Sequence, residues 1–233
     1  MNVEIWSDIV CPWCYIGKRH LEAALADFAH RDEVTRIWRS FQLDPGAPAV
    51  SEGDPLDRLA AKYGMTRVQA EAAQTRVTAA AAEAGLEFHL DRARQGNTFD
   101  AHRLLHHAAS LGHQDELKER LMAAYFTEGE AIGDRDVLTR LADVVGLEAV
   151  AASAVLDGDD FAEAVRGDVQ TARELGITGV PFFVVDGRFG ISGAQPAEVI
   201  LSALRKAWSA GHPLEMAHSA ASDVACADGT CPA

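Results

Sequence analysis

The sequence predicts an α/β protein in which a large all-helical domain interrupts a domain that contains strands. Three observations predict this class. An apolar run, a Cys-x-x-Cys sequence and a helical pattern follow one another near the N-terminus; the middle of the chain carries only helix start and stop signals; and two apolar strands joined by Asp-Gly come near the C-terminal end. The chain has 233 residues, enough to bury a sizeable core.

The first predicted strand, residues 3–6, leads into Cys11-Pro12-Trp13-Cys14 and a helical pattern. Cys11 lies where unpaired helix N–H groups and the positive end of the helix dipole favour a thiolate. Pro12 suits a first helical position because its missing N–H would have no partner there, and Pro12 and Trp13 are expected to tune the pair. A C-x-x-C beside a βαβ pattern in an intracellular protein is typical of a thioredoxin-like redox motif.

The pair has two alternative roles. With the second close pair, Cys226 and Cys231, it would supply the four thiolates of a zinc site, but zinc knuckles usually bring Gly or a turn around the pair. A purely structural disulfide between adjacent helical turns closes so short a loop that it removes little unfolded-state entropy. Redox chemistry is the better account, and we predict no metal ligands.

The composition of the chain limits the classes of partner that it is expected to bind. The net charge of -14 argues against nucleic acid, an anionic membrane or a polyanion as the main partner. The first residues lack the features of a secretory signal, and no apolar run approaches the length of a bilayer span, so we expect a cytoplasmic protein. In a reducing compartment, four cysteines in two close pairs indicate catalysis, redox sensing or metal binding.

A second strand is predicted at residues 34–41, where apolar and polar residues alternate. Strand, helix and strand in this order form the first half of a thioredoxin fold. We therefore expect a discontinuous thioredoxin-like domain in residues 1–51 and 166–211, a helical insertion domain in residues 52–165, and a mobile tail in residues 212–233 that carries the second cysteine pair.

The insertion is predicted from repeated helix boundaries. Residues of the N-cap type are followed by apolar or Ala-rich helical patterns and then by Gly. The expected starts and stops are Asp54-Pro55, a capping box at Thr66 to Gln69 ending at Gly85, Thr98 to Gly112, Asp134 to Gly146, and Asp159 or Asp160 to Gly176.

Strand character returns at residues 180–185 and, after the turn Asp186-Gly187, at residues 189–191. Gln195-Pro196 starts a last amphipathic helix. The bond before Pro181 is either an ordinary trans bond at a strand start or a cis bond facing the redox pair. A cis bond would leave backbone groups of Val180 free to bind an extended substrate.

Three stretches resemble the DsbA superfamily, and more narrowly its FrnE-type cytoplasmic branch: Asp8 to Lys18, Asn97 to Leu104 and Gly176 to Phe183. The resemblance extends over nearly the whole chain and implies a thioredoxin fold with an inserted helical domain.

The resemblance also implies thiol–disulfide oxidoreductase or isomerase activity on protein or peptide disulfides. By position, Cys11 would attack, Cys14 would resolve the mixed disulfide, and Pro181 would be a cis proline beside Val180 in the substrate site. The redox group is the disulfide itself, with an external thiol reductant or oxidant and no other cofactor.

Two alternative functions stay open. The 2-hydroxychromene-2-carboxylate isomerases and kappa-class glutathione transferases share this architecture, which suggests a glutathione-dependent isomerase or transferase of small molecules. In those enzymes a serine typically replaces the first cysteine, and the intact pair here makes this reading secondary. The non-catalytic alternative is a redox sensor that holds zinc.

The resemblance makes Asn97 and His102 candidates for support of the cleft, and His106 joins His102 as a candidate for metal binding or proton transfer. The two histidines are one turn apart on a predicted helix and would suit a metal or proton transfer, but no third ligand is apparent from spacing. The alternative is that Thr98 caps the helix while the histidines pack or face solvent.

The tail is the last candidate. Asp228-Gly229 between Cys226 and Cys231 can turn tightly enough to bring their thiols together. A flexible tether places this auxiliary redox pair within reach of Cys11 and Cys14, where it would assist their reduction or regulate them. The alternative is an incidental pair in an unstructured tail.

Overall fold

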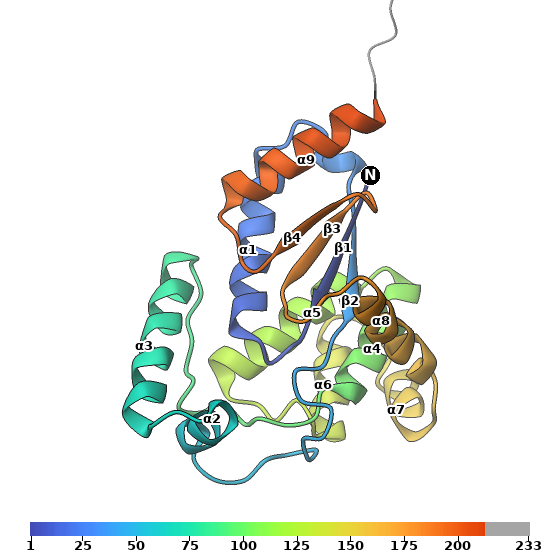
Figure 1. The fold of residues 1–233 in the computed structure, drawn as a ribbon. Coiled ribbons are helices and arrows are strands. Elements are labelled where there is room, and N and C mark those ends of the chain that lie inside the picture. The colour runs from blue at the N-terminus through green and yellow to red at the C-terminus, as the bar shows by residue number, and fades with distance from the viewer. Residues whose placement is uncertain (213–233) are drawn as a thin grey trace, which may run out of the picture.

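The computed structural model describes residues 1–212 as a four-stranded sheet with helices on both faces (Figure 1). In chain order the elements are β1 (Asn2–Ser7), α1 (Pro12–Ala26), the short 3₁₀ helix η1 (Arg31–Glu33), β2 (Thr35–Ser40), α2 (Pro55–Tyr63), α3 (Arg67–Glu83), α4 (Phe99–Leu111), α5 (Gln114–Ala123), the π turn η2 (Ala124–Glu128), α6 (Arg135–Val144), α7 (Ala149–Asp157), α8 (Ala162–Glu174), β3 (Phe182–Val185), β4 (Phe189–Ser192) and α9 (Ala197–Gly211).

The strand order is β2-β1-β3-β4. β1 and β2 are parallel and joined through α1, whereas β3 runs antiparallel to β1, with Phe182 opposite Trp6, and forms a hairpin with β4. Sheet and helices together confirm the predicted class, a thioredoxin fold with a helical insertion between β2 and β3.

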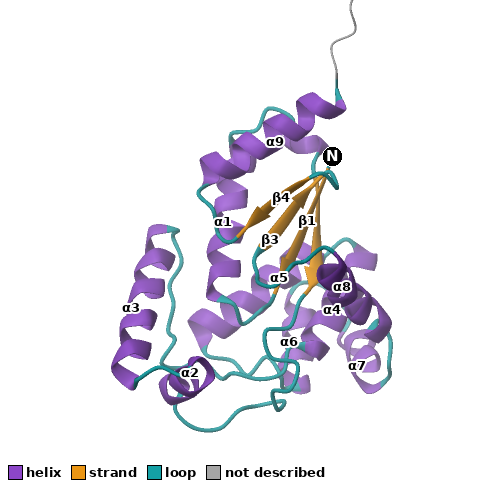
Figure 2. Ribbon diagram, in the orientation of Figure 1, coloured by secondary structure: helices purple, strands orange, loops and turns teal. Residues whose placement is uncertain are grey.

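Different helices cover the two faces of the sheet, because successive side chains of each strand point to opposite faces. Ile5 and Phe183 pack with α1 and α9 on one face, in a core that also holds Leu21 and Leu204. Neighbouring side chains of the same strands, among them Trp6, pack on the opposite face with residues of α8 and the loop after it. Figure 2 shows the strands as a thin layer between these helices.

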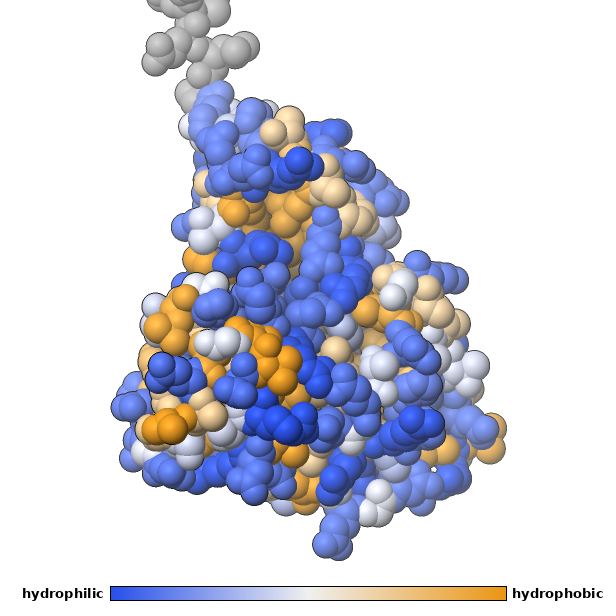
Figure 3. Space-filling view, turned by 180° about the vertical axis from the view of Figure 1, so that it is seen from behind, coloured by the Kyte–Doolittle hydropathy of each residue, from blue (hydrophilic) through white to orange (hydrophobic). Residues whose placement is uncertain are grey.

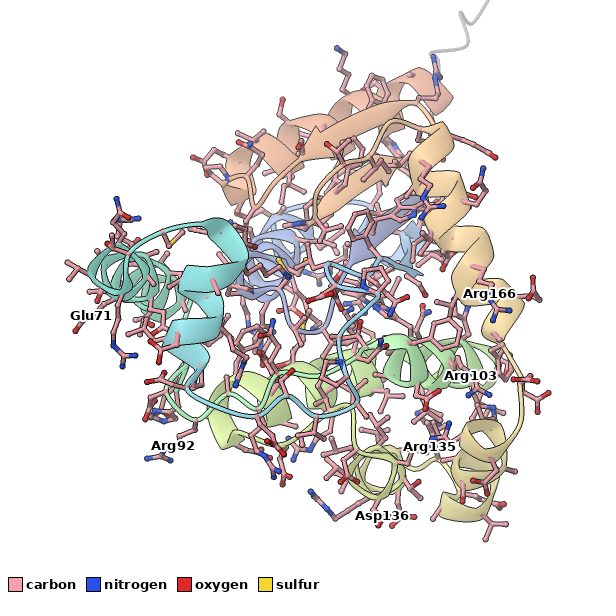
Figure 4. The ribbon with its side chains drawn as sticks, turned by 60° about the horizontal axis from the view of Figure 1, so that its bottom comes forward. Glu71, Arg92, Arg103, Arg135, Asp136 and Arg166 are labelled. Carbon is pink, nitrogen blue, oxygen red and sulfur yellow. The ribbon has the colours of Figure 1, made fainter. Side chains whose placement is uncertain are left out.

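The insertion has two parts. α2 and α3 pack on each other, and α3 also packs on α1; α4 to α8 form a bundle that rests on β2 through α5 and α8. The buried guanidinium of Arg103 holds this bundle together by donating to backbone carbonyls of the α7–α8 corner. Figure 4 shows Arg103 and Arg135 on the bundle and Glu71 on the separate α2–α3 side.

The predicted helix starts are formed at Asp54, whose carboxylate accepts from Leu56 N at 2.8 Å, and at Thr66, where both bonds of the capping box are present. At α4, Thr98 is the N-cap residue and Gly112 the C-cap, as predicted, but the expected side-chain bond from Thr98 is missing. Instead Asn97 Oδ1 accepts from Phe99 N at 2.8 Å. The side chain that satisfies the first N–H group of α4 is therefore that of the residue before the N-cap.

Asp168 on α8 fixes the bundle to β2. Its carboxylate accepts from Ser40 N at 2.8 Å, lies 3.0 Å from His106 Nε2 on α4, and accepts from Arg39 at 3.2 Å. α8 packs on both α4 and β2, so it links the thioredoxin-like sheet to the insertion. The division into residues 1–51, 52–165 and 166–211 stays a prediction.

The surface seen from behind is mainly hydrophilic, and its apolar residues form separate patches (Figure 3). Within residues 1–212, none of the helices is long and apolar enough to cross a bilayer.

Asp168→Asn is expected to destabilise the fold at pH 7 by about 2 kcal/mol, because Ser40 N loses a charged acceptor. Burial raises the pKa of Asp168, but His106, Ser40 N and Arg39 outweigh burial and hold it below the ordinary 3.8. The stabilisation is thus present above that pH and lost as pH falls through the lowered pKa. In urea unfolding, the difference in free energy of unfolding between the variant and the wild type should become smaller below about pH 4.

Glu163→Gln, on the same helix, is the matched control. Glu163 is exposed and, among residues 1–212, pairs only with Arg166, so its loss is expected to change stability by less than about 0.5 kcal/mol. An equally small change in the free energy of unfolding for Asp168→Asn would contradict the proposal that Asp168 fixes the helical bundle to β2.

Candidate active site

The sheet topology brings the cysteine pair and Pro181 together. Because β1 and β3 are antiparallel, the end of β1 lies beside the start of β3. Cys11 follows shortly after β1, and Pro181 immediately precedes β3. The Cys11 thiol donates to the Val180 carbonyl with an Sγ–O distance of 3.6 Å. The Val180–Pro181 bond is cis, the isomer that the resemblance implies.

Cys11 is the N-cap residue of α1, and Pro12 occupies the first helical position. The Cys11 carbonyl accepts from Cys14 N at 3.0 Å, so the helix begins directly beneath the first thiol. The first turn contains no acidic residue, which leaves the positive end of the helix dipole uncompensated there. Both cysteines are free thiols.

The two thiols have unequal surroundings. Cys14 is 1% exposed, and burial together with the neighbouring Cys11 raises its pKa well above the ordinary 9.0. Lys118 and Ser7 act in the opposite direction but are outweighed. Cys11 is 4% exposed and lines a cavity that Cys14 does not reach. An external reactant therefore meets Cys11 first.

The cavity has a volume of about 490 Å³ and lies between the start of α1, the α2–α3 part of the insertion and the loop before β3. Figure 1 shows α2 and α3 beside the lower end of α1. Cys11, Pro12, Trp13 and Val180 form one side, and the other is largely apolar, with residues such as Leu59, Val77, Tyr125 and Phe126.

The charged residues that line this cavity are all basic: Arg58, Lys62 and Arg76. They are a local exception in a chain with a net charge of -14. Their positive charge, next to an apolar wall and a thiol, favours an anionic reactant with apolar parts.

α1 makes its closest approach to the start of β3 at Gly17. A Cβ placed on Gly17 would lie 3.0 Å from Pro181 Cγ and 3.3 Å from the tip of the Phe183 ring. Even a methyl group would therefore push Pro181, and with it the carbonyl that faces Cys11.

Asn97 and His102 are not among the residues that line this cavity. Asn97 donates to the carbonyls of Pro45 and Ala47, which fixes the loop after β2. His102 is buried, with its Nε2 3.1 Å from the Phe41 carbonyl and 3.4 Å from Asp8 Oδ1. Both residues thus support the fold around the site.

Asp8 is the centre of this support. Its buried carboxylate accepts from Ile9 N and Leu43 N, each at 2.8 Å, besides contacting His102. Although burial raises the pKa of Asp8, His102, Leu43 N and the charge of Lys118 bring it below its usual value. Asp8 is therefore held as a carboxylate beneath the cysteine pair.

Within residues 1–212, no group of three or more His, Cys, Asp or Glu side chains is placed to hold a metal. His106, the other candidate ligand, lies against Asp168 and Ser40. Cys226 and Cys231 lie outside the described residues, so the auxiliary pair and the four-cysteine zinc alternative stay predictions.

Comparison with known families gives a match of residues 2–205 to the DSBA-like thioredoxin domain. The chain belongs to this family. A crystal structure of a probable DsbA oxidoreductase from Streptomyces coelicolor is 45% identical, with a TM-score of 0.86 and 94% of each chain covered. Among curated proteins, the uncharacterised protein YwbO of Bacillus subtilis is 28% identical over 88% of this chain and 96% of its own length.

More distant structures share the DSBA-like fold alone. The cytosolic disulfide reductase DsbM from Pseudomonas aeruginosa is 18% identical, with a TM-score of 0.62 over 88% of this chain and all of that one. A 2-hydroxychromene-2-carboxylate isomerase is 15% identical, with a TM-score of 0.67 over 91% of this chain and 98% of that one.

Several residues of this DSBA-like site were not singled out from the sequence. The basic residues of α2 and α3 look like ordinary solvated positions, and only the fold turns them toward Cys11. Gly17 lies inside the stretch that carries the resemblance, yet its contact with Pro181 exists only once the strands have paired into the sheet. Lys118 is in a polar segment with no sign of burial.

Gly17→Ala is expected to destabilise the protein by about 1 to 2 kcal/mol, since overpacking against Pro181 outweighs the gain in helix propensity. The reaction of Cys11 with an external disulfide should also slow. Gly167→Ala is the matched control, a helical Gly with nothing within 4 Å of the added Cβ. It should stabilise by about 0.5 kcal/mol and leave Cys11 unchanged. Equal behaviour of the two variants would exclude the steric role of Gly17.

Proposed function

We propose that this chain is a thiol–disulfide oxidoreductase or isomerase that acts on protein or peptide disulfides through Cys11 and Cys14. The observation that carries the proposal is the unequal placing of the two thiols. Cys11 stands at a helix N-terminus and lines the cavity, whereas Cys14 is buried behind it with a raised pKa. This arrangement suits an attacking thiol and a resolving thiol.

In the reductive direction the Cys11 thiolate attacks a substrate sulfur and one substrate thiolate leaves. Cys14 then attacks Cys11 Sγ, which releases the second substrate thiol and leaves a Cys11–Cys14 disulfide. The reverse sequence oxidises a substrate dithiol. Isomerisation results when another thiolate of the substrate, in place of Cys14, attacks the mixed disulfide, forms a new substrate disulfide and releases the Cys11 thiolate. Val180, next to Cys11 and before the first residue of β3, is suited to bind the main chain of an extended substrate.

We further propose that the external thiol that completes the cycle is glutathione. The compartment in which the protein acts is proposed to be the cytoplasm. Glutathione is an anionic thiol, which suits the three basic residues and the apolar wall beside Cys11. The cytosolic disulfide reductase DsbM has also been solved with GSH, at 19% identity to this chain and a TM-score of 0.62. No cofactor beyond the redox-active disulfide is needed by this chemistry.

A glutathione-dependent isomerase or transferase of small molecules is the second candidate, because the cavity beside Cys11 is large enough for a small substrate. The two functions make different demands on Cys14. Disulfide exchange through an intramolecular disulfide requires it, whereas activation of glutathione for an isomerisation does not.

Cys11→Ser is expected to reduce turnover with a protein disulfide, such as insulin, to the rate without enzyme, because the attacking thiol is gone. Cys14→Ser should instead accumulate mixed disulfides at Cys11, visible by mass spectrometry under non-reducing conditions. Normal insulin reduction by the Cys11→Ser protein would refute the assignment. Full turnover by Cys14→Ser with a small substrate and glutathione, without trapped adducts, would favour the isomerase.

Removing two cavity charges tests the glutathione proposal. Lys62→Met with Arg76→Met should raise KM for glutathione about fivefold to tenfold, since each exposed ionic contact contributes up to about 1 kcal/mol. The KM for a neutral thiol, such as 2-mercaptoethanol, should stay within about twofold. Arg92→Gln removes an exposed charge outside the cavity and should change neither KM (Figure 4). An unchanged KM for glutathione in the double variant would remove the charge-based argument.

A further inference from the structure

Tyr125 is a buried tyrosine whose hydroxyl has no partner in the described part of the fold. It is 6% exposed and lines the same cavity as Cys11. Among residues 1–212 its hydroxyl makes no hydrogen bond, and it is not one of the polar atoms that are sealed from solvent without a partner. The hydroxyl therefore faces the cavity. A buried tyrosine hydroxyl usually has a hydrogen-bond partner, because leaving it unpaired costs free energy.

Tyr15 gives the contrast. It is 3% exposed, but its hydroxyl lies 2.5 Å from Glu119 Oε1 and 3.3 Å from Arg19 Nη2. Both tyrosines lie next to Phe126, with ring centroids 6.0 Å away for Tyr15 and 4.8 Å away for Tyr125. Hydrogen bonds within the fold thus account for the hydroxyl of Tyr15, whereas the hydroxyl of Tyr125 is left for a bound molecule.

The π turn η2, which carries Tyr125, is fixed through its backbone and its side chains. The Phe126 carbonyl accepts from His89 N at 2.7 Å, and the Phe126 ring stacks on Phe88 with centroids 4.5 Å apart. π turns inserted at the end of α-helices are frequent at functional sites, and this one directly follows α5. Because the wall is already ordered, a molecule that binds Tyr125 need not order it.

The lining of the cavity indicates which acceptor the hydroxyl binds. Among the described residues, no carboxylate lines it. Its basic residues lie toward solvent, since Lys62 and Arg76 are exposed and Arg58 is half-buried, whereas Tyr125 and the neighbouring apolar wall at Val77 are buried. The basic residues suit the anionic part of a reactant. A neutral donor in an apolar wall suits an uncharged acceptor, because a charge would lose more hydration there.

Burial raises the pKa of Tyr125 above its ordinary 10, so its hydroxyl keeps its proton at neutral pH and can donate. An amide carbonyl is the uncharged acceptor that both reactants of the proposed cycle carry. It is present in the backbone of a peptide and in glutathione.

We propose, resting on the oxidoreductase function above, that Tyr125 is a specificity-determining residue: its hydroxyl donates a hydrogen bond to an amide carbonyl of the molecule that exchanges with Cys11. The bond favours thiols and disulfides that carry an amide over those that carry none. Tyr125 takes part in no covalent step and gives up no proton.

Protection of Cys11 against alkylation tests this bond without turnover. Cys11 is reacted with N-ethylmaleimide, and the concentration of a thioether that halves the rate is measured, since a thioether cannot exchange disulfides. S-methylglutathione carries amides and charges. N-acetyl-S-methylcysteine methylamide carries amides alone and represents a peptide, and S-methylcysteine carries charges and no amide.

In Tyr125→Phe the half-protecting concentration should rise about threefold to tenfold for an amide ligand, because one hydrogen bond is lost. For S-methylcysteine it should stay within about twofold. A rise for S-methylglutathione alone identifies glutathione as the source of the carbonyl, and a rise for the methylamide identifies a peptide backbone. The thermal midpoint should stay the same or increase, because the variant removes an unpaired buried hydroxyl.

Tyr15→Phe is the matched control, because it removes the same atom from the neighbouring tyrosine. It should lower the thermal midpoint, since Glu119 and Arg19 lose a partner, and leave all three half-protecting concentrations within about twofold. A purely structural Tyr125 predicts this same pattern for Tyr125→Phe.

The proposal is overturned if neither amide ligand needs a higher concentration in Tyr125→Phe than in the wild type, or if neither protects the wild type. A loss of the same size for S-methylcysteine would overturn it as well, because that ligand has no amide. Failure of the oxidoreductase function is a separate result. It would appear as absence of insulin reduction by the wild type, a reaction that the protection assay does not involve.

Discussion

The site depends on a buried carboxylate that joins three separate segments. Asp8 binds the backbone at the start of its own loop, the backbone of Leu43 after β2, and His102 on α4. A buried charge is stable only when its hydrogen-bonding capacity is used, and each of these partners comes from a different part of the fold. Asp8 thereby fixes the loop that ends at Cys11 to both the sheet and the insertion.

The insertion adds to the thioredoxin-like sheet an electrostatic environment that the sheet lacks. Its α2–α3 part supplies basic residues that line the cavity with Cys11, and α5 supplies the fully buried cation Lys118. α5 is held in place by Gln114, whose side-chain amide donates to the Trp38 carbonyl and accepts from Trp38 N, both at 3.0 Å. This pairing closes the free edge of β2 and sets the position of Lys118 at once.

Local signals predicted much of the fold from sequence. The alternation in β2, the capping box at Thr66, and the turn at Asp186 and Gly187, both with positive φ, act over a few residues and are formed as expected. α5 and α7 were not predicted as separate helices. Each begins without a side-chain cap bond, so the strongest local start signal is missing from both.

The residues of the site could be predicted only in part, because a local sequence pattern marks only some of them. Cys11, Cys14 and Pro181 were found because a spacing and a strand pattern mark them. The burial of Lys118 and the approach of Gly17 to Pro181 depend on contacts between segments far apart in the chain, which no local pattern encodes.

The pairing of Trp6 with Phe182 has a consequence for biosynthesis. A ribosome delivers β1, the cysteine pair and β2 long before β3, and the whole insertion emerges in between. During that interval one edge of β1 is open, and the Val180 carbonyl that faces Cys11 has not yet been made. Contacts of such long sequence separation form late. A nascent chain that already carries both thiols is therefore an incomplete catalyst until its final strands are joined to the first.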